Sequence, residues 1–311
     1  MRILIVGAGA TGGYFGGRLL EAGRAVTFLV RPARAEELER DGLVVRSPLG
    51  NFQYPSPPLL VEHQLDETYD LILLSCKAYD LEAAMESFAQ AVGPGTSILP
   101  LLNGMAHLDR LTDTFGADAV LGGQCMISLD RDSTGAILHL NEANQLSFGE
   151  LSGGLTPRIL RVAEALADAG FEANLSQHIV QDMWDKWCFI ATGAGVTGAM
   201  RGTVGDVLEA GGEWLIDSLM SECLLIATAA GFAPSEATRQ RYLKILTEPR
   251  SRLTASMLRD IERDMGTEVE QILGDLSARR DALGVVVPQP SILDIACVHL
   301  RTYEARRRRE Q

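Results

Sequence analysis

The hydrophobic pattern at the start of the chain predicts a strand, a glycine-rich turn, a helix and a second strand. Residues 3–6 are apolar and lead directly into the G-x-G-x-x-G sequence Gly7-Ala8-Gly9-Ala10-Thr11-Gly12. Helical periodicity then covers Tyr14–Ala22, and a second apolar run follows at Ala25–Val30. This order and spacing are typical of a βαβ unit, in which both strands belong to one parallel sheet.

Strands and helices continue to alternate as far as residue 176. Further strands are expected at Asp70–Cys76, Thr96–Leu102, Ala119–Leu121 and Phe171–Leu175, and helices at Leu81–Ala91, Ala106–Phe115 and Leu155–Ala169. Three short apolar runs separated by turns, Met126–Leu129, Ala136–Leu140 and Gln145–Phe148, predict an antiparallel edge added to the parallel sheet.

From about residue 177 the strand signals disappear and helical periodicity takes over. Glycines and prolines predict the breaks between these helices, at Gly193/Gly195, Gly211-Gly212, Gly231–Pro234, Gly266 and Gly284–Pro290. The sequence therefore predicts an α/β protein. An N-terminal Rossmann dinucleotide-binding domain covers residues 1–176, and an all-helical C-terminal domain covers residues 177–311.

The context of the G-x-G-x-x-G turn gives each of its glycines a task. Gly7 permits the tight turn, Gly9 allows the backbone to approach a pyrophosphate, and Gly12 lets helix and strand pack closely. Unpaired N–H groups and the dipole at the helix N-terminus favour a bound anion. A glycine turn without a ligand is the simpler alternative, but the flanking strand and helix favour a dinucleotide site formed by residues 7–12.

The end of the second strand indicates which dinucleotide is bound. An NAD site usually carries Asp or Glu there, to accept hydrogen bonds from the ribose 2′-hydroxyl. This chain instead has Arg31, with Arg34 one turn on and no acid before Glu36. A guanidinium suits a 2′-phosphate, to which it makes bidentate charge-assisted bonds. Two solvated surface arginines are the alternative, and we predict NADPH as the cofactor.

Composition narrows the classes of partner. The chain has 311 residues, of which 46% are apolar and 22% charged, and its formal net charge is −13. Neither nucleic acid nor an anionic membrane is expected to attract such a protein. The five cysteines lack C-x-x-C or Cys/His spacing, which predicts neither disulfides nor a metal site. With no signal-peptide pattern and no apolar stretch of membrane-spanning length, a cytoplasmic location is expected.

Polar residues follow two of the predicted strands, at the edge where ligands of such sheets bind. Lys77 closes one strand. Asn103-Gly104 closes the next strand, although this dipeptide is equally typical of a simple turn.

The helical half contains a candidate catalytic lysine. Lys186 lies between Trp184 and Trp187 and precedes fourteen uncharged residues. A helix this apolar is buried on most sides, and desolvation would lower the pKa of Lys186 toward neutrality, as a general acid requires. A lysine that snorkels to the surface is the alternative. After a predicted helix at Ser251–Met265, a capping box at Thr267–Glu270 makes Glu268 the first residue of a new helix.

Together these features resemble the ketopantoate reductase (2-dehydropantoate 2-reductase) family over essentially the whole chain. The matching motifs are the N-terminal fingerprint with Arg31, Leu74–Lys77, Leu102-Asn103-Gly104-Met105, Trp184-x-Lys186, Ser256-Met257-Leu258-x-Asp260, Thr267-Glu268-Val269 and the turn Gly284–Pro288. The resemblance implies an active site in the cleft between the two domains. It also implies NADPH-dependent reduction of a 2-oxo acid to a 2-hydroxy acid, foremost 2-dehydropantoate to pantoate in pantothenate biosynthesis.

The resemblance further implies roles for individual residues. Lys186 matches the general acid that protonates the alkoxide, and Glu268 matches the carboxylate that orients this lysine and binds a substrate hydroxyl. Ser256 matches a substrate-binding residue. Asn103 matches the residue that spans nicotinamide and substrate, and Lys77 matches a residue near the cofactor.

Four positions depart from the family pattern, each from polar to apolar: Ile190, Ala194, Val204 and Leu273. Ile190 and Ala194 lie four and eight residues after Lys186, on the same helical stripe, where they would contact the substrate. A site that hydrogen-bonds a substrate hydroxyl loses much of its specificity for that substrate when its polar residues are replaced. The reductase chemistry is therefore expected to be retained, whereas a bulkier or less polar 2-oxo acid competes with 2-dehydropantoate as the substrate.

Two other functions stay open at this point. One is a related NAD(P)-linked hydroxy-acid or opine-type dehydrogenase. The Lys186/Glu268 pair speaks against it, and His107, the histidine nearest the cofactor motifs, is better explained as a first-turn helix residue. The other is a non-catalytic NADPH-binding sensor. The helical half could present a face for a homodimer, but the sequence leaves the oligomeric state open.

Overall fold

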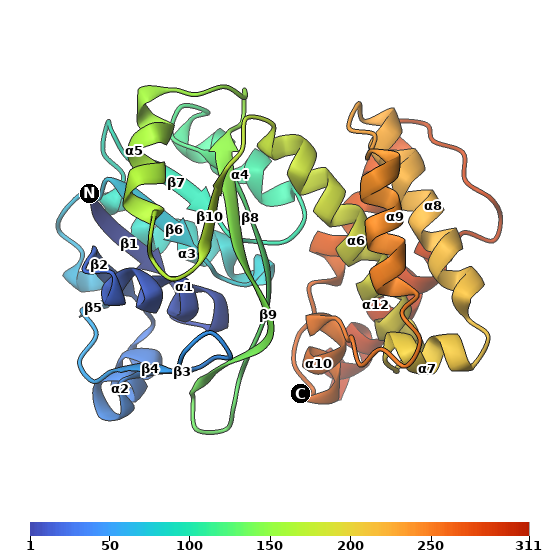
Figure 1. The fold of residues 1–311 in the computed structure, drawn as a ribbon, viewed down its shortest axis with the longest axis horizontal. Helices are drawn as coiled ribbons and strands as arrows, with labels where there is room; N and C mark the ends of the chain where they lie inside the picture. Colours follow the sequence, from blue (N-terminus) through green and yellow to red (C-terminus); the bar gives the residue numbers. More distant parts are fainter. Residues whose placement is uncertain (311) are drawn as a thin grey trace. The chain divides into compact units, whose positions relative to one another are not determined.

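In a computed structural model, which describes residues 1–310, the chain folds into two compact units. The first comprises Met1–Leu102 and His107–Val180, and the second combines Asn103–Ala106 with residues 181–310. All the labelled strands belong to the first unit, and the second is helical (Figure 1). The predicted fold class, a Rossmann-type α/β domain followed by a helical domain, is confirmed.

The first unit contains a parallel sheet with the strand order β5-β2-β1-β6-β7. Its strands are β1 (Arg2–Val6), β2 (Ala25–Leu29), β5 (Leu59–Leu60), β6 (Leu71–Leu74) and β7 (Ser97–Pro100). Because β1 pairs with β2 on one side and with β6 on the other, the strand order reverses between β1 and β6. Ligands of doubly wound sheets bind at such a switch point, beyond the carboxyl ends of the strands.

A second sheet forms where the sequence predicted an antiparallel edge of the first. Strands β8 (Leu121–Arg131) and β9 (Ile137–Glu150) pair in a long antiparallel hairpin, drawn in green in Figure 1. The sheet is completed by β3 (Leu43–Arg46), β4 (Phe52–Tyr54) and β10 (Glu172–Leu175).

The predicted edge was therefore wrong. The three short runs are parts of β8 and β9, and the exposed residues 140–143, among them Asn141 and Glu142, interrupt the apolar pattern of β9. Of the predicted strand Ala119–Leu121, Val120 makes a single bridge to Ile98 and Leu121 begins β8.

Helix α1 (Ala10–Glu21) contacts both sheets because it carries glycines on two faces. An added Cβ at Gly16 would lie 2.6 Å from Phe28 of β2 in the parallel sheet. An added Cβ at Gly13 would lie 2.4 Å from Ile137 of β9 in the second sheet. These glycines thus let the helix pack closely against strand side chains of both sheets.

The remaining helices of the first unit follow the predicted order. They are α2 (Pro32–Asp41), α3 (Leu81–Phe88), α4 (Ala106–Phe115) and α5 (Pro157–Leu166), with short 3₁₀ turns η1 (Glu62–Gln64), η2 (Ala78–Asp80) and η3 (Ala89–Ala91). The α2 helix was not predicted.

Most of α6 (Ile179–Met200), a helix of 22 residues, belongs to the second unit, which takes up the chain at Gln181. The other helices are α7 (Val204–Glu209), α8 (Glu213–Ala229), α9 (Glu236–Leu246), α10 (Ser256–Glu262), the π-helix η4 (Glu270–Gly274), α11 (Asp275–Ala282) and α12 (Ile292–Glu310). Of the helices within residues 1–310, none combines the length and apolarity that crossing a bilayer requires.

Two predictions for this unit were wrong. The break expected at Gly193/Gly195 does not occur, and α6 continues through both glycines. An added Cβ at Gly195 would lie 2.6 Å from Leu219 of α8. This glycine makes room for a neighbouring helix rather than ending its own. The capping box expected at Thr267–Glu270 does not form, and no side chain caps η4. The Thr267 hydroxyl instead donates to Glu304 of α12 at 2.7 Å.

Glu222 of α8 is a buried acid with a structural task. Its carboxylate accepts hydrogen bonds from the Ser291 hydroxyl at 2.6 Å, from the N–H of Ile292 at 2.7 Å and from the N–H of Leu293 at 3.3 Å. Burying a charge is costly unless it is hydrogen-bonded, and the N–H groups at the start of α12 satisfy this one. Glu222 therefore ties α8 to the N-terminus of α12.

Candidate active site

The glycine turn lies at the carboxyl end of β1, between this strand and α1. Gly7 has a φ of +92°, a conformation that favours glycine. The Ser75 hydroxyl, just after β6, lies 3.1 Å from the carbonyl oxygen of Val6 and 2.9 Å from that of Gly7. An added Cβ at Gly12 would lie 2.1 Å from both the Gly7 carbonyl and the Ser75 hydroxyl. Sequence reasoning missed Ser75, because its role depends on the pairing of β1 with β6.

The turn is open at Gly9, the residue that precedes α1. An added Cβ there would meet no atom within 4 Å, and no side chain caps this end of the helix. The backbone is therefore accessible where a pyrophosphate would approach, and the positive end of the helix dipole lies beside it. The residues of this turn fit the phosphates of a dinucleotide.

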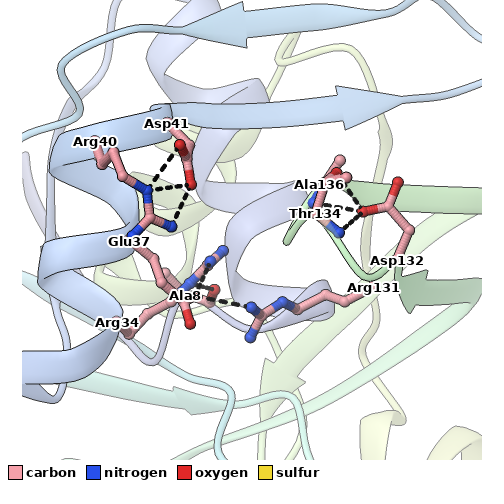
Figure 2. A network of polar contacts seen from close by, with 9 residues as sticks. All are labelled: Ala8, Arg34, Glu37, Arg40, Asp41, Arg131, Asp132, Thr134 and Ala136. Atoms are coloured by element: carbon pink, nitrogen blue, oxygen red, sulfur yellow. Dashed lines mark hydrogen bonds and ion pairs between the residues drawn. The ribbon is translucent and has the colours of Figure 1, made fainter.

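Arg34 of α2 is turned back onto the glycine turn, as Figure 2 shows. Its Nε donates to the carbonyl of Ala8 at 3.0 Å, and its Nη1 donates to Glu37 at 2.7 Å. Glu37 also accepts a hydrogen bond from Arg131 of β8 at 2.9 Å. Burial lowers the pKa of Arg34, and the hydrogen bond from Arg34 lowers the pKa of Glu37. Arg34 thus supports the glycine turn, and its partner Glu37 links it to Arg131 of the second sheet.

Arg31, between β2 and α2, remains accessible. Its side chain is 70% exposed, and its Nη2 lies 2.7 Å from the carboxylate of Asp80 at the end of η2. The hydrogen bond to Asp80 raises the pKa of Arg31. Lys77 immediately precedes η2, so it too follows the end of β6. The structure therefore brings Arg31, Lys77 and the glycine turn to one edge of the parallel sheet.

A second group of predicted residues lies in the helical unit. Lys186 of α6 is 7% exposed, and its Nζ donates to the side-chain carbonyl of Asn103 at 3.0 Å. Asn103 belongs to this unit although it follows β7 in the chain. Trp184 and Trp187 are almost fully buried, and the guanidinium of Arg279 lies 5.9 Å and 5.7 Å from their ring centroids. The predicted lysine is thus buried and does not snorkel to the surface.

The π-helix η4 also contacts Asn103. Gln271 donates from its side-chain amide to the backbone carbonyl of Asn103 at 2.8 Å. Gly104 has a φ of +76°, and an added Cβ there would lie 2.5 Å from the Gln271 carbonyl. Trp187 donates from Nε1 to the carbonyl of Ile272 at 2.8 Å. Sequence reasoning missed Gln271, because its contact depends on a π-turn that the helical pattern does not reveal.

Glu268 lies two residues before the first residue of η4. It is 8% exposed, and its backbone carbonyl accepts a hydrogen bond from the N–H of Ile272 at 3.0 Å. π-helices are rare and occur frequently at functional sites. The two ionisable residues predicted to act in catalysis, Lys186 and Glu268, are therefore both buried in the helical unit.

The other predicted substrate residues are spread along α6 and its neighbours. Ser256 begins α10, and the N–H of Ala255 donates to the Thr197 hydroxyl at 3.4 Å, about 16 Å along α6 from Lys186. Ile190 is half-buried, and Ala194, Val204 and Leu273 are at most 2% exposed. A surface groove along α12, of about 620 Å³, contains none of the predicted site residues.

The fold and the glycine turn define a two-domain protein with Rossmann-type dinucleotide binding. The sequence matches the family described as ketopantoate reductase PanE/ApbA over residues 3–153, and the C-terminal family of the same name over residues 178–294. The chain belongs to the ketopantoate reductase family and is an oxidoreductase.

Individual relatives agree with this assignment. The chain is 34% identical to the uncharacterized oxidoreductase YkpB of Bacillus subtilis, over 98% of this chain and 99% of that protein. A crystal structure of 2-dehydropantoate 2-reductase from Geobacter metallireducens is similar, with 26% identity, a TM-score of 0.88 and coverage of 97% and 99%. D-mandelate dehydrogenase, solved with NADH and anilino(oxo)acetate, has the same fold at 21% identity, with a TM-score of 0.87 and coverage of 99% and 100%.

Proposed function

We propose that the protein is an NADPH-dependent reductase that converts a 2-oxo acid to the 2-hydroxy acid, with 2-dehydropantoate as its leading substrate. Membership of the ketopantoate reductase family supports the reaction class. The observation that carries the proposal is the buried Lys186, hydrogen-bonded at 3.0 Å to Asn103. A buried ammonium beside an amide is suited to an oxygen that gains negative charge during a reaction.

Residues of the first unit would hold the cofactor. The glycine turn from Gly7 to Gly12 and the N-terminus of α1 would bind its pyrophosphate, and Arg31 would bind its 2′-phosphate. Lys77 would contact the cofactor nearer its nicotinamide, and Asn103, a residue of the second unit, would do the same. When bound, NADPH supplies the hydride that reduces the carbonyl carbon of the substrate.

The protein's own residues would handle the proton and the orientation of the substrate. Lys186 would donate a proton from Nζ to the carbonyl oxygen as negative charge develops there, and its positive charge would stabilise that oxygen. Glu268 would orient Lys186 and accept a hydrogen bond from a substrate hydroxyl. Asn103 would align the ammonium, and Ser256, the first residue of α10, would contribute to substrate binding.

The apolar residues Ile190, Ala194, Val204 and Leu273 favour a second candidate substrate, a 2-oxo acid with a less polar side chain. D-mandelate dehydrogenase, whose likeness concerns the fold alone, was solved with anilino(oxo)acetate, a ligand that carries an aromatic ring. A chain with this fold can therefore hold a less polar oxo acid.

Two substrates that differ by one hydroxyl separate these candidates. The analogue of 2-dehydropantoate without its hydroxyl is 3,3-dimethyl-2-oxobutanoate. If Glu268 binds the hydroxyl, kcat/KM with NADPH should be higher for 2-dehydropantoate by about 10²-fold or more, because a polar site rejects an analogue that leaves its groups unpaired. Equal values would identify a reductase of less polar acids. Tight NADPH binding without turnover of either acid, or of an aromatic 2-oxo acid, would indicate the sensor instead.

Gln271 is expected to act as a positioning residue. Gln271→Leu keeps the size of the side chain but removes its hydrogen bond to the Asn103 carbonyl. Because small displacements of catalytic groups are costly, kcat should fall by about 10-fold while KM for the oxo acid changes little. Steady-state kinetics test this, with the exposed Gln240→Leu of α9 as the matched control. A fall in melting temperature with unchanged kcat would leave Gln271 a structural role only.

A further inference from the structure

Arg31, the guanidinium expected to bind the 2′-phosphate, already has a carboxylate partner. We propose that Asp80 sets the balance between NADPH and NADH, by competing with the 2′-phosphate for Arg31 and by repelling that phosphate. This inference rests on the proposed function, in which Arg31 contacts the 2′-phosphate. It adds a specificity-determining residue that lies outside the G-x-G-x-x-G motif and outside the end of β2.

The topology of the parallel sheet brings the two residues together. Arg31 follows β2, and Asp80 ends the 3₁₀ turn η2 that follows β6. Strands β2 and β6 flank β1 in parallel, so both residues lie at the carboxyl edge, on either side of the glycine turn. Their 2.7 Å ion pair therefore crosses the region where the adenosine ribose of a dinucleotide is expected.

The neighbouring arginines are engaged elsewhere, which leaves Arg31 with the main role. Arg34 donates to Ala8 and to Glu37, and Arg131 donates to the same Glu37 (Figure 2). The side chain of Arg34 is only 14% exposed, compared with 70% for Arg31. A 2′-phosphate would therefore depend chiefly on Arg31, and a change in the partner of Arg31 should alter NADPH binding directly.

Asp80 is expected to weaken the binding of NADPH but not that of NADH. An ion pair as exposed as Arg31–Asp80 is weak, so it does not exclude a phosphate. A guanidinium has five N–H donors and could hold both anions, but the charge of Asp80 would remain beside the phosphate dianion. NADH carries an uncharged 2′-hydroxyl, which can donate a hydrogen bond to a carboxylate. Asp80 thus disfavours NADPH and is compatible with NADH.

Direct binding of each coenzyme to the whole protein tests this inference without a substrate. Asp80→Asn keeps the shape of the side chain and removes its charge. Titration followed by nicotinamide fluorescence at low salt should give a Kd for NADPH about five-fold lower than that of the wild type. The Kd for NADH should not fall, and the gain with NADPH should shrink at high salt, because surface charges are screened.

Two further variants separate failure of this inference from failure of the proposed function. Glu82→Gln removes a nearby acid that pairs with Arg110 instead of Arg31, and should leave both Kd values unchanged. In an Arg31→Ala background, Asp80→Asn should no longer tighten NADPH by the full amount. If Arg31→Ala weakens NADPH selectively but Asp80→Asn has no effect or weakens NADPH, the role of Asp80 is refuted and the proposed cofactor stands. If Arg31→Ala weakens both coenzymes equally, the assignment of the 2′-phosphate is wrong, and the role of Asp80 with it.

Discussion

Replacing Lys186 with methionine should lower kcat for 2-oxo acid reduction by about 10²–10⁴-fold, the usual contribution of a positioned proton donor. Methionine keeps the length of the buried side chain but can neither donate a proton nor stabilise negative charge. The Kd for NADPH should change little, because the glycine turn and Arg31, not Lys186, are expected to bind the phosphates. Steady-state kinetics and coenzyme titration on the same preparations measure both quantities.

The chain offers a matched control for this experiment. Lys244 lies exposed on α9, so Lys244→Met makes the same chemical change away from the predicted site. It should leave kcat, KM and the Kd for NADPH unchanged. A Lys186→Met protein with near-normal kcat would discard the general acid role.

Alanine at Gly9 and at Gly12 should produce two different defects from the same added methyl group. At Gly9 the methyl meets no protein atom within 4 Å, so Gly9→Ala should fold normally. The methyl would nevertheless occupy space that the pyrophosphate needs. NADPH affinity should fall by about 10- to 100-fold, since overpacking costs about 1–3 kcal/mol.

At Gly12 the methyl would lie 2.1 Å from the Gly7 carbonyl and from the Ser75 hydroxyl, so the protein itself must shift. Gly12→Ala should lose about 1–3 kcal/mol of stability as well as NADPH binding. Gly95→Ala, which also meets no atom within 4 Å, is the control that should change neither property. Thermal unfolding and coenzyme titration separate these outcomes. Normal NADPH binding by Gly9→Ala would contradict a pyrophosphate at this turn.

Most of the parallel sheet could be predicted from the sequence because its strands are short, apolar and punctuated by glycines. The second sheet could not, because β9 presents polar residues to solvent and its pairing with β3 and β10 is set by contacts distant in the chain. The continuity of α6 was missed for a related reason. A glycine that makes room for Leu219 looks, in the sequence alone, like a glycine that ends a helix.

The residues of the candidate site likewise fall into those that a sequence motif indicates and those that only the folded structure reveals. Lys186, Asn103 and the glycine turn could be proposed from the sequence because each stands in a recognisable motif. Ser75, Asp80 and Gln271 were missed because their contacts arise only when separate strands or a π-turn bring them to a partner. The domain limits at 176 and 177, the homodimer and the cytoplasmic location stay predictions.

Transfer of deuterium from NADPH that carries the label at both C4 positions of the nicotinamide tests whether the protein reduces 2-oxo acids. The wild-type protein should yield a 2-hydroxy acid deuterated at C2, which mass spectrometry of the product would detect. Lys186→Met should yield almost none in the same time, although it binds the coenzyme. If the wild-type protein binds NADPH tightly but transfers no deuterium to 2-dehydropantoate, its deoxy analogue or an aromatic 2-oxo acid, the protein is not the reductase proposed here.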